Sequence, residues 1–577
     1  MKLKSLFPAS EWLREYSSHQ LKGDLAAGLT VGVMLIPQGM AYAMIAGLPP
    51  IYGLYASTLP LIIYALLGTS RQLAVGPVAM VSLLTASGIG VLAQGGTEVY
   101  IQLAIVLALM VGLIQFLLGA FRLGFLVNFL SHPVISGFTS AAALIIGLSQ
   151  LKHLLGVDIA RSHHVHEILL QAIEQFGAIN WVTFGIGIGG IVLIKGAKRI
   201  NKALPGSLLA VLFGILLVWI MGLTNQGVKI VGEIPKGLPA FQIPTFSWET
   251  IRSLLPVALA ISLVSFMESI AVAKAIQARH KDYKVVPNQE LIALGLANIG
   301  GSFFQSYPIT GGFSRSAVND EAGAKTGLSS IVSALLIIFT LLFLTPVFYY
   351  LPKAILASII MVAVFGLIDT KEPLTLWKTH RSDFWMLIIT FLGTLTLGIE
   401  LGIGLGVLLS LAMIIFETTR PHMAVLGKVP GRPFYRNQDR FEQVEDRPDL
   451  LIVRFDARLY FANLGYFQSK LEKWIKAKGD ALQTLIINAE SINSLDSSAL
   501  HLLEEIVADV RESGKEIVFS GVRGPVRDLL LRAGLFQKIG ENNFFMTVQS
   551  AVDHHDRQHP NQAAEMRTYT MQANRRR

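Results

Sequence analysis

The chain has 577 residues, of which 52% are hydrophobic and only 15% are charged, and its formal net charge is +9. A globular protein carries about 25% charged residues, so this composition excludes a single soluble core and indicates at least two domains, one of them apolar enough for a membrane. The absence of cysteine excludes disulfide bonds, thiolate catalysis and cysteine-ligated metals.

The charged residues are distributed unevenly along the chain. Residues 1–420 hold 45 of them, and the much shorter stretch 421–577 holds 42. Residues 1–20 form a polar arm that lacks the apolar core of a removable signal peptide. We therefore expect an N-terminal arm at 1–20, a transmembrane domain at 21–420 and a soluble part after it. No basic run is interleaved with aromatic residues, so we expect no nucleic-acid partner.

Long apolar stretches recur after the arm, and a helix that spans a membrane needs about 20 such residues. We predict fourteen segments, near 23–46, 51–68, 72–92, 99–121, 126–149, 179–195, 205–222, 253–277, 288–304, 309–318, 328–350, 353–368, 384–399 and 400–418. With this even number, the arm and the loops on its side hold 17 Lys and Arg, against 6 in the opposite loops. The basic excess marks the cytoplasmic face, so both termini are expected in the cytoplasm.

The third and tenth segments are interrupted near their starts. The third begins Gln72-Leu-Ala-Val-Gly-Pro-Val-Ala-Met80 and the tenth Tyr307-Pro-Ile-Thr-Gly-Gly-Phe-Ser-Arg-Ser316. Paired broken segments at matching places in two halves are typical of a transporter site. The N-terminus of a half-helix presents unpaired N–H groups and partial positive charge, so two facing ends can bind an anion without a metal. The alternative is two Gly/Pro kinks in ordinary long helices.

The soluble part predicts a small α/β domain. The stretch from Pro421 to Pro448 is polar, holds four prolines and predicts a linker over 421–447. Strands at 450–455, 482–488 and 516–520 then alternate with helices at 467–478, 497–512 and 526–533, within a domain at 448–555. Residues 556–577 are expected to be a disordered tail.

Four stretches resemble the SulP family, which comprises the sulfate permeases and their animal relatives such as prestin and pendrin. They are Gly32–Tyr55, which is close to a family signature, and Gly68–Pro77, Asn288–Asn298 and Thr310–Asn319. In the soluble part, Asn493–Leu500 follows a predicted strand and resembles a STAS domain. The resemblance covers residues 10–555.

The resemblance implies an all-α polytopic membrane domain of fourteen segments, built as a 7+7 inverted repeat like that of the uracil transporters. A core domain would contain spans 1–4 and 8–11, and a gate domain spans 5–7 and 12–14. The resemblance further implies a homodimer in the lipid bilayer of the plasma (inner) membrane, with a cytoplasmic STAS domain and an elevator-like alternating-access mechanism. No dinucleotide or Walker motif is present, so we expect no enzymatic activity and no cofactor. His163, His164 and His166 could form a metal site in an outside loop, but no second cluster of ligands accompanies them, so we expect a solvated loop and no metal.

Arg315 is the first candidate for the anion site, since a charge buried in a membrane is costly and usually functional. Its alternative is a side chain that snorkels to the cytoplasm. The family resemblance places the anion between the two half-helices, beside Val78, Gly312, Phe313, Ser314 and Arg315. It also matches Gln38 and Tyr42, one turn apart in span 1, to the family pocket; ordinary helix packing is the alternative.

Glu268 is the only carboxylate well inside a predicted span. Such a group, between apolar surroundings and a nearby arginine, can exist in either protonation state and couple transport to protons. Proton-coupled SulP members resemble this sequence in having a glutamate on span 8. The alternative is a permanently neutral glutamate that only forms hydrogen bonds with the helix backbone.

Ser497 is a candidate regulatory residue in the STAS part. It matches the serine that is phosphorylated in anti-sigma antagonists, and it would stand at a helix N-terminus, where a phosphate is stabilised. The alternative is an N-cap hydroxyl that follows Asp496.

These features favour secondary active transport of a small inorganic anion, first of all sulfate uptake by proton symport. Chloride/bicarbonate exchange and sodium-coupled bicarbonate uptake stay open, as does a non-transporting sensor or motor. Nucleobase uptake is disfavoured because the tenth segment carries Ser314 and Arg315 and no acid before Asp320.

Overall fold

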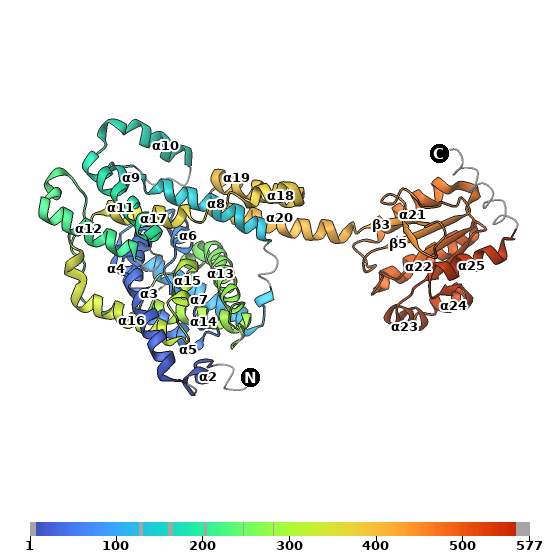
Figure 1. Ribbon diagram of the computed structural model, residues 1–577, viewed down its shortest axis with the longest axis horizontal. Helices are drawn as coiled ribbons and strands as arrows, with labels where there is room; N and C mark the ends of the chain where they lie inside the picture. Colours follow the sequence, from blue (N-terminus) through green and yellow to red (C-terminus); the bar gives the residue numbers. More distant parts are fainter. Residues whose placement is uncertain are drawn as a thin grey trace. The chain divides into compact units, whose positions relative to one another are not determined.

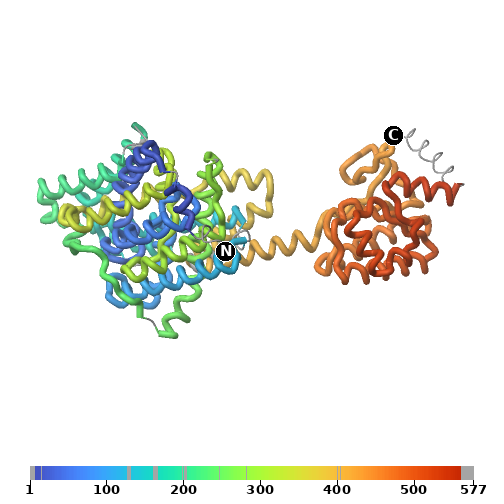
Figure 2. Tube along the Cα trace, turned by 90° about the horizontal axis from the view of Figure 1, so that it is seen from below, coloured from blue at the N-terminus to red at the C-terminus, as the bar shows by residue number. Residues whose placement is uncertain are grey.

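The computed structural model describes residues 7–14, 16–125, 131–159, 165–200, 205–245, 247–280 and 282–560. The chain divides into two compact units, and the boundary along the chain lies between Leu411 and Ala412. The first unit is a packed bundle of helices, and the second is a sheet flanked by helices (Figures 1 and 2). Each unit has its own hydrophobic core.

The first unit is almost entirely helical. Its helices, the last of which continues into the second unit, are α2 (Ala9–Arg14), α3 (Ser18–Ile45), α4 (Ile51–Tyr55), α5 (Leu59–Leu67), α6 (Ala79–Gly90), α7 (Glu98–Ala120), α8 (His132–Ser149), α9 (Leu151–Leu155), α10 (Val165–Glu174), α11 (Trp181–Ile200), α12 (Gly206–Met221), α13 (Trp248–Gln277), α14 (Pro287–Ser302), α15 (Phe313–Glu321), α16 (Leu328–Phe339), α17 (Lys353–Phe365), α18 (Glu372–Thr379), α19 (Arg381–Leu397) and α20 (Ile399–Thr419). Within the described residues, five helical stretches are long and apolar enough to cross a membrane, and shorter apolar helices accompany them.

Each of the fourteen predicted segments coincides with one or two of these helices. The predicted segment 328–350 differs in its second half, where α16 passes into a π-helical turn (Thr340–Leu344) and a 3₁₀ turn (Thr345–Phe348). Pro346 lies in the 3₁₀ turn, and a proline cannot donate the N–H that would continue the α-helix. The short helices α9, α10 and α18 were not predicted, because they are too short for the segment length that the prediction used.

Both interrupted segments have the predicted form of an extended run followed by a short helix. Strand β1 (Val75–Gly76) precedes α6, and strand β2 (Thr310–Gly311) precedes α15. The two strands pair antiparallel, with Val75 opposite Gly311 and Gly76 opposite Thr310. The pairing brings together the starts of two half-helices that lie more than 230 residues apart in the chain.

Close packing of small residues joins the two halves of the chain. Helices α7 and α14 approach so closely that a Cβ atom on Gly112 would lie 2.7 Å from the Gly295 carbonyl oxygen. A Cβ atom on Gly295 would in turn lie 2.6 Å from the backbone nitrogen of Phe116. Only glycine fits at these two positions, as is usual where membrane helices pack by van der Waals contact.

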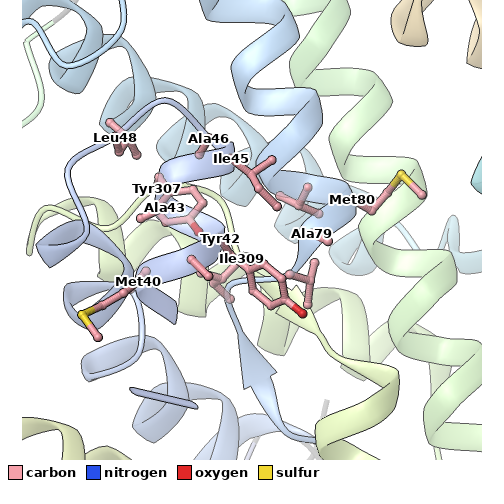
Figure 3. Packing of buried hydrophobic residues seen from close by; sticks show 14 of the residues in the cluster. Met40, Tyr42, Ala43, Ile45, Ala46, Leu48, Ala79, Met80, Tyr307 and Ile309 are labelled. Atoms are coloured by element: carbon pink, nitrogen blue, oxygen red, sulfur yellow. The ribbon is translucent and has the colours of Figure 1, made fainter. Parts of the chain in front are cut away.

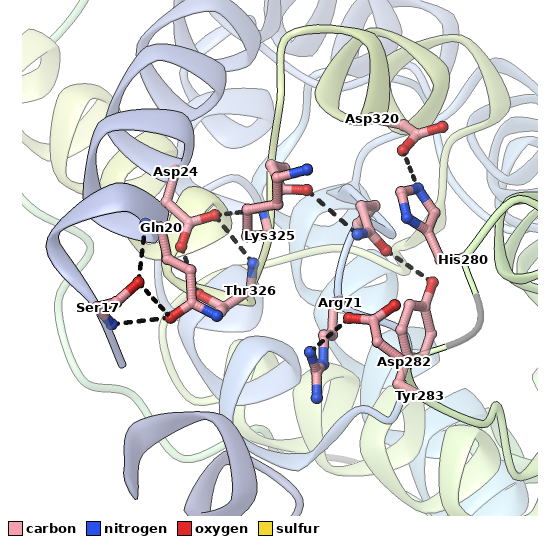
Figure 4. A network of polar contacts seen from close by, with 12 residues as sticks. Ser17, Gln20, Asp24, Arg71, His280, Asp282, Tyr283, Asp320, Lys325 and Thr326 are labelled. Carbon is pink, nitrogen blue, oxygen red and sulfur yellow. Dashed lines mark hydrogen bonds and ion pairs between the residues drawn. The ribbon is translucent and has the colours of Figure 1, made fainter. Parts of the chain in front are cut away.

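Buried carboxylates also connect the halves. Asp24 in α3 accepts hydrogen bonds from the backbone nitrogens of Lys325 and Thr326, at 2.6 and 2.9 Å, and from the Thr326 hydroxyl (Figure 4). Glu290 in α14 accepts hydrogen bonds from the Tyr64 hydroxyl and from the backbone and hydroxyl of Thr69. Buried polar groups need hydrogen-bond partners. Each of these carboxylates finds partners in a loop of the opposite half of the chain and so fixes that loop in place.

The second unit contains a six-stranded sheet in the order β4-β3-β5-β6-β7-β8. The strands are β3 (Met423–Lys428), β4 (Tyr435–Asn437), β5 (Leu450–Phe455), β6 (Thr484–Asn488), β7 (Glu516–Ser520) and β8 (Phe544–Phe545). Strands β5 to β8 run parallel, whereas β3 pairs antiparallel with β5. The helices are α21 (Leu464–Lys478), α22 (Ser497–Glu512), α23 (Gly524–Arg532), α24 (Leu535–Ile539) and α25 (Val548–Gln558).

This unit contains β8, α24 and α25 in addition to the predicted elements, and it differs from the prediction at both ends. The stretch 421–447 does not remain free of regular structure, because β3 and β4 form there and β3 joins the sheet. The helix α25 continues to Gln558 and so includes the first residues of the predicted tail 556–577. The remainder of that tail, from residue 561, lies outside the described residues.

Candidate functional site

The site begins with two half-helix N-termini that meet. Val78 is the N-cap of α6 and Gly312 is the N-cap of α15, and neither helix start has a side-chain capping hydrogen bond. A Cβ atom on Gly312 would lie 3.3 Å from Val78 Cγ1, so the two caps are almost in contact. Free N–H groups and the positive ends of both helix dipoles therefore point to one place.

Arg315 lies in the first turn of α15 and is 2% exposed. Its Nη1 donates a hydrogen bond to the Pro77 carbonyl oxygen at 2.7 Å. Its Nε and Nη2 are buried and have no hydrogen-bond partner. A Cβ atom on Gly312 would lie 2.8 Å from Nη2, so the free side of the guanidinium faces the N-cap of its own helix. Two unpaired donors of a buried cation form a ready recognition element for an oxyanion.

Glu268 comes from α13 and contributes the opposite charge. Its Oε2 is buried without a hydrogen-bond partner, and the side chain interacts electrostatically with Arg315. Among the described residues, no direct ion pair joins Glu268 to Arg315, but the two charges are near enough to attract each other. The site therefore contains one basic and one acidic group whose hydrogen-bonding capacity is incompletely used.

The α3 residues line the same region. Tyr42 is 7% exposed and interacts electrostatically with both Arg315 and Glu268. It belongs to the buried cluster that also contains Ala79, Tyr307 and Ile309 (Figure 3). Gln38 lies one turn before Tyr42 on the same helix and is 8% exposed. The structure thus places Tyr42 beside the two charged groups, with Gln38 on the same face of α3.

Phe313 and Ser314 lie differently from the other predicted residues. Both side chains are exposed, Phe313 to 60%, and they do not join the buried group around Arg315. They remain at the first two positions of α15, where their backbone N–H groups belong to the helix N-terminus. Their contribution to a bound anion would come from the backbone more readily than from the phenyl ring.

The residues of α13 that hold strand β2 in place were not predicted. Ser269 Oγ accepts a hydrogen bond from the Gly311 backbone nitrogen at 2.8 Å and bonds the Thr310 hydroxyl at 2.7 Å. The Thr310 hydroxyl donates to the carbonyl oxygen of Ser265 at 2.6 Å. The signal that could have identified this face of α13 is the spacing of Ser262, Ser265 and Ser269 around Glu268, three or four residues apart.

In the second unit, Ser497 is the first residue of α22 and is exposed. Its hydroxyl is not the N-cap, because the N-cap is Asp496, whose side chain accepts a hydrogen bond from the Ala499 backbone nitrogen at 2.8 Å. The alternative interpretation of Ser497 as the capping residue is therefore wrong. Among the described residues, no group of three or more His, Asp or Glu side chains is arranged to hold a metal ion.

Comparisons with known proteins agree with this arrangement. The profile of the Sulfate permease family matches residues 21–390, and that of the STAS domain matches residues 443–551. Sulfate transporter 4.1, chloroplastic, of Arabidopsis thaliana is 41% identical over 568 residues, which cover 95% of this chain and 82% of that protein. High affinity sulfate transporter 2 of Stylosanthes hamata is 36% identical over 571 residues, which cover 95% of this chain and 86% of that protein.

Solved structures show the same fold. The murine Solute Carrier 26 family member A9 anion transporter, in an inward-facing state, superimposes with a TM-score of 0.87 at 26% identity, over 95% of this chain and 93% of that chain. The transmembrane domain of the cyanobacterial bicarbonate transporter BicA superimposes with a TM-score of 0.59 at 22% identity, over 68% of this chain and 98% of that chain, a likeness of fold alone.

The predicted family and fold class, a polytopic helical domain with a C-terminal STAS domain, are confirmed. The chain belongs to the sulfate permease family of membrane transporters.

Proposed function

We propose that this protein is a secondary active transporter that takes up sulfate together with a proton. The observation that carries the proposal is the pair of unpartnered donors on Arg315, Nε and Nη2, beside two uncapped helix N-termini. A buried cation with unused donors is costly unless a ligand compensates it. A small oxyanion satisfies the guanidinium and the backbone N–H groups at once.

Sulfate is favoured over other anions by the relatives, since the most similar ones given above are named sulfate transporters. A strongly hydrated dianion needs many donors to replace its water, and this site offers two helix N-termini in addition to Arg315. Chloride/bicarbonate exchange and sodium-coupled bicarbonate uptake are the alternatives that the experiment below distinguishes.

Proton coupling would use Glu268. A site loaded with sulfate moves net negative charge against the membrane potential, at about 2.3 kcal/mol per charge and 100 mV. A proton on Glu268 offsets one charge, and it also removes the repulsion between a bare carboxylate and the bound anion. Protonation and anion binding would therefore favour each other reciprocally.

Alternating access would follow from movement of a core (spans 1–4 and 8–11) past a gate (spans 5–7 and 12–14). Support comes from the contacts that join the two halves of the core. The β1–β2 pairing connects spans 3 and 10, Asp24 connects span 1 to Thr326, and Glu290 connects span 9 to Thr69. Elements joined by buried contacts of this kind can move as one body.

The proposal includes the setting of the transporter. It would work as a homodimer in the plasma (inner) membrane, with both termini and the STAS domain in the cytoplasm, as the distribution of Lys and Arg between the loops indicates. The family and the relatives are transporters, which supports transport as its activity.

The test is uptake of radiolabelled sulfate by proteoliposomes that contain the full-length protein, at a fixed sulfate gradient, with and without an imposed inward proton gradient. We expect the proton gradient to stimulate uptake by the wild type. Glu268→Gln should retain sulfate/sulfate exchange and lose the stimulation, whereas the control Glu98→Gln, an exposed carboxylate at the start of α7, should retain both. If the wild type shows no stimulation, or if Glu268→Gln keeps all of it, proton symport is wrong and exchange or sodium coupling takes its place.

A further inference from the structure

A polar cavity lies in the first unit, and none of its lining residues belongs to β1 or β2. Its volume is about 450 Å³, and it lies where α5 and α7 end and α14 begins, with Pro8, Glu11 and Trp12 of the N-terminal arm on one side. These helix ends and the arm lie on the face that the distribution of basic residues predicts to be cytoplasmic. The cavity is therefore expected at the level of the lipid headgroups, on the cytoplasmic side.

The charged side chains that line this cavity are mostly basic. It includes Arg71, Arg122 and Lys284, against the single carboxylate of Glu11. Arg71 is held in place by an ion pair with Asp282 at 2.9 Å. Arg122 and Lys284 are exposed, and their side chains form no hydrogen bond or ion pair with any described residue. Two basic groups are thus free to bind an anion that enters the cavity.

Ser70 makes one part of the cavity wall polar. It lines the cavity and is 5% exposed, and its Oγ is buried beside the hydroxyls of Tyr64 and Tyr283. Its backbone nitrogen donates to Glu290. Charge-assisted hydrogen bonds to a phosphate in the cavity therefore come from Arg122 and Lys284.

The outer surface of α7 indicates where such a phosphate comes from. Leu113, Leu117 and Phe121 are 44%, 48% and 72% exposed. They are four residues apart, so they form one apolar stripe along the helix. The stripe leads directly to Arg122, and Ala120 belongs both to the exposed surface and to the cavity lining. An acyl chain can lie along the stripe while its headgroup enters the cavity.

We propose that this cavity is a binding site for an anionic phospholipid, with the headgroup phosphate at Arg122 and Lys284 and an acyl chain along Leu113, Leu117 and Phe121. A phospholipid headgroup and free phosphate both present phosphate oxygens to the basic side chains. Only the lipid has an acyl chain that can also contact the apolar stripe on α7. Basic pockets between membrane helices at the cytoplasmic side are suited to phosphorylated headgroups. The site is separate from the proposed sulfate site, and neither Arg122 nor Lys284 takes part in that proposal.

The absence of cysteine allows a probe at a single position. In the full-length protein, Ala120→Cys is labelled with a small fluorophore and titrated in mixed micelles with phosphatidylglycerol or phosphatidylcholine that carries brominated acyl chains. Bromine quenches the fluorophore only when the acyl chain lies beside α7. We expect half-maximal quenching at a much lower mole fraction of phosphatidylglycerol than of phosphatidylcholine.

The variant Arg122→Gln/Lys284→Gln should abolish this preference. Each basic side chain near an anionic lipid contributes about 1 kcal/mol, or roughly fivefold in affinity, so the double variant should weaken phosphatidylglycerol binding about 25-fold. The control Lys22→Gln/Lys378→Gln removes the same charge from two exposed positions outside the cavity and should keep the preference. Native mass spectrometry of the unlabelled variants, which counts bound lipids, provides a check that is independent of the probe.

Three outcomes would overturn the proposal. The first is equal quenching by both lipids in the wild-type background. The second is an equal loss of the preference in the control variant, which would assign it to net charge alone. The third is a fluorescence change with inorganic phosphate and no preference for phosphatidylglycerol, which would assign the cavity to a soluble anion.

Discussion

Arg315 Nη1 donates a hydrogen bond of 2.7 Å to the carbonyl oxygen of Pro77. The bond joins the first turn of α15 to the residue that precedes the N-cap of α6. It orients the guanidinium so that Nε and Nη2 remain without partners between the two helix N-termini. One arginine therefore both joins the two half-helices and supplies unused donors for a ligand.

Replacement of Arg315 by alanine should weaken sulfate binding strongly. Each hydrogen bond to a charged group contributes about 1.5–3 kcal/mol, so the loss of even one of the two free donors should lower affinity by roughly 10- to 100-fold. Isothermal titration calorimetry of the purified protein measures this. The control is Arg279→Ala, because Arg279 is an exposed arginine that pairs with Asp320. Unchanged affinity of Arg315→Ala for sulfate would show that the anion binds elsewhere.

Sulfate affinity should fall as the pH rises, because ionised Glu268 repels the anion and protonated Glu268 does not. A change of roughly tenfold lies within the usual range of about 1–3 kcal/mol for coupling between two sites. Glu268→Gln should bind with an affinity that does not depend on pH. Calorimetry at mildly acidic and mildly alkaline pH makes the comparison. A wild type without pH dependence, or a glutamine variant with the full dependence, would exclude Glu268 as the coupling group.

Ser269→Ala should disturb the site without touching its charged groups. The substitution removes the acceptor of the Gly311 N–H and a partner of the Thr310 hydroxyl, and an unpaired buried donor costs about 1–3 kcal/mol. Thermal stability and sulfate affinity should both decrease. Ser262→Ala is the matched control, because its hydroxyl bonds the Ala258 carbonyl in its own helix at 2.6 Å and the Val111 carbonyl in α7 at 3.4 Å, and neither partner belongs to β2. If both variants lower affinity equally, the effect is general to α13 and does not act through β2.

Asp449→Asn should loosen α25 in the STAS domain. His555 in α25 is fully buried, and it bonds Asp449 at 2.9 Å and the Thr484 hydroxyl at 2.7 Å. Burial opposes ionisation of Asp449, but hydrogen bonds with His555 and Arg447 outweigh it and hold the pKa of Asp449 below its usual value. A lowered carboxyl pKa stabilises the folded state above the unfolded pKa of about 3.9, and this contribution is lost as the pH falls through the folded value.

At neutral pH the full stabilisation is present, and breaking a buried charged network costs about 3–5 kcal/mol. Hydrogen exchange in the full-length protein should therefore be much faster in α25 of Asp449→Asn than in the wild type, and the difference should shrink below about pH 4. Asp446→Asn is the control, since Asp446 forms an exposed ion pair with Lys478. Unchanged protection of α25 at neutral pH would show that Asp449 does not hold the helix in place.

Local sequence pattern was sufficient to predict most helices of the first unit and several strands of the second. The fourteen segments were predicted from apolar runs, and both half-helices from their Gly-rich interruptions. Both signals depend only on residues that are close together in the sequence. The strands at 450–455 and 516–520 and the helix at 497–512 were predicted with the bounds that the structure has. By contrast, β3 was missed because its neighbours include four prolines and its partner β5 lies beyond a long connection.

Contacts between distant residues could not be predicted from local pattern. Apolar periodicity and Gly-rich interruptions were enough to predict that Arg315 and Glu268 lie in spans and that two half-helices exist. The antiparallel pairing of Val75 with Gly311, the serine acceptor at Ser269 and the bond from Arg315 to Pro77 join residues more than 40 positions apart. Such pairings depend on how helices pack against each other, which periodicity within one segment does not encode. The position of Arg315 in a span was thus predictable. Its bond to Pro77, which leaves its other donors without partners, was not.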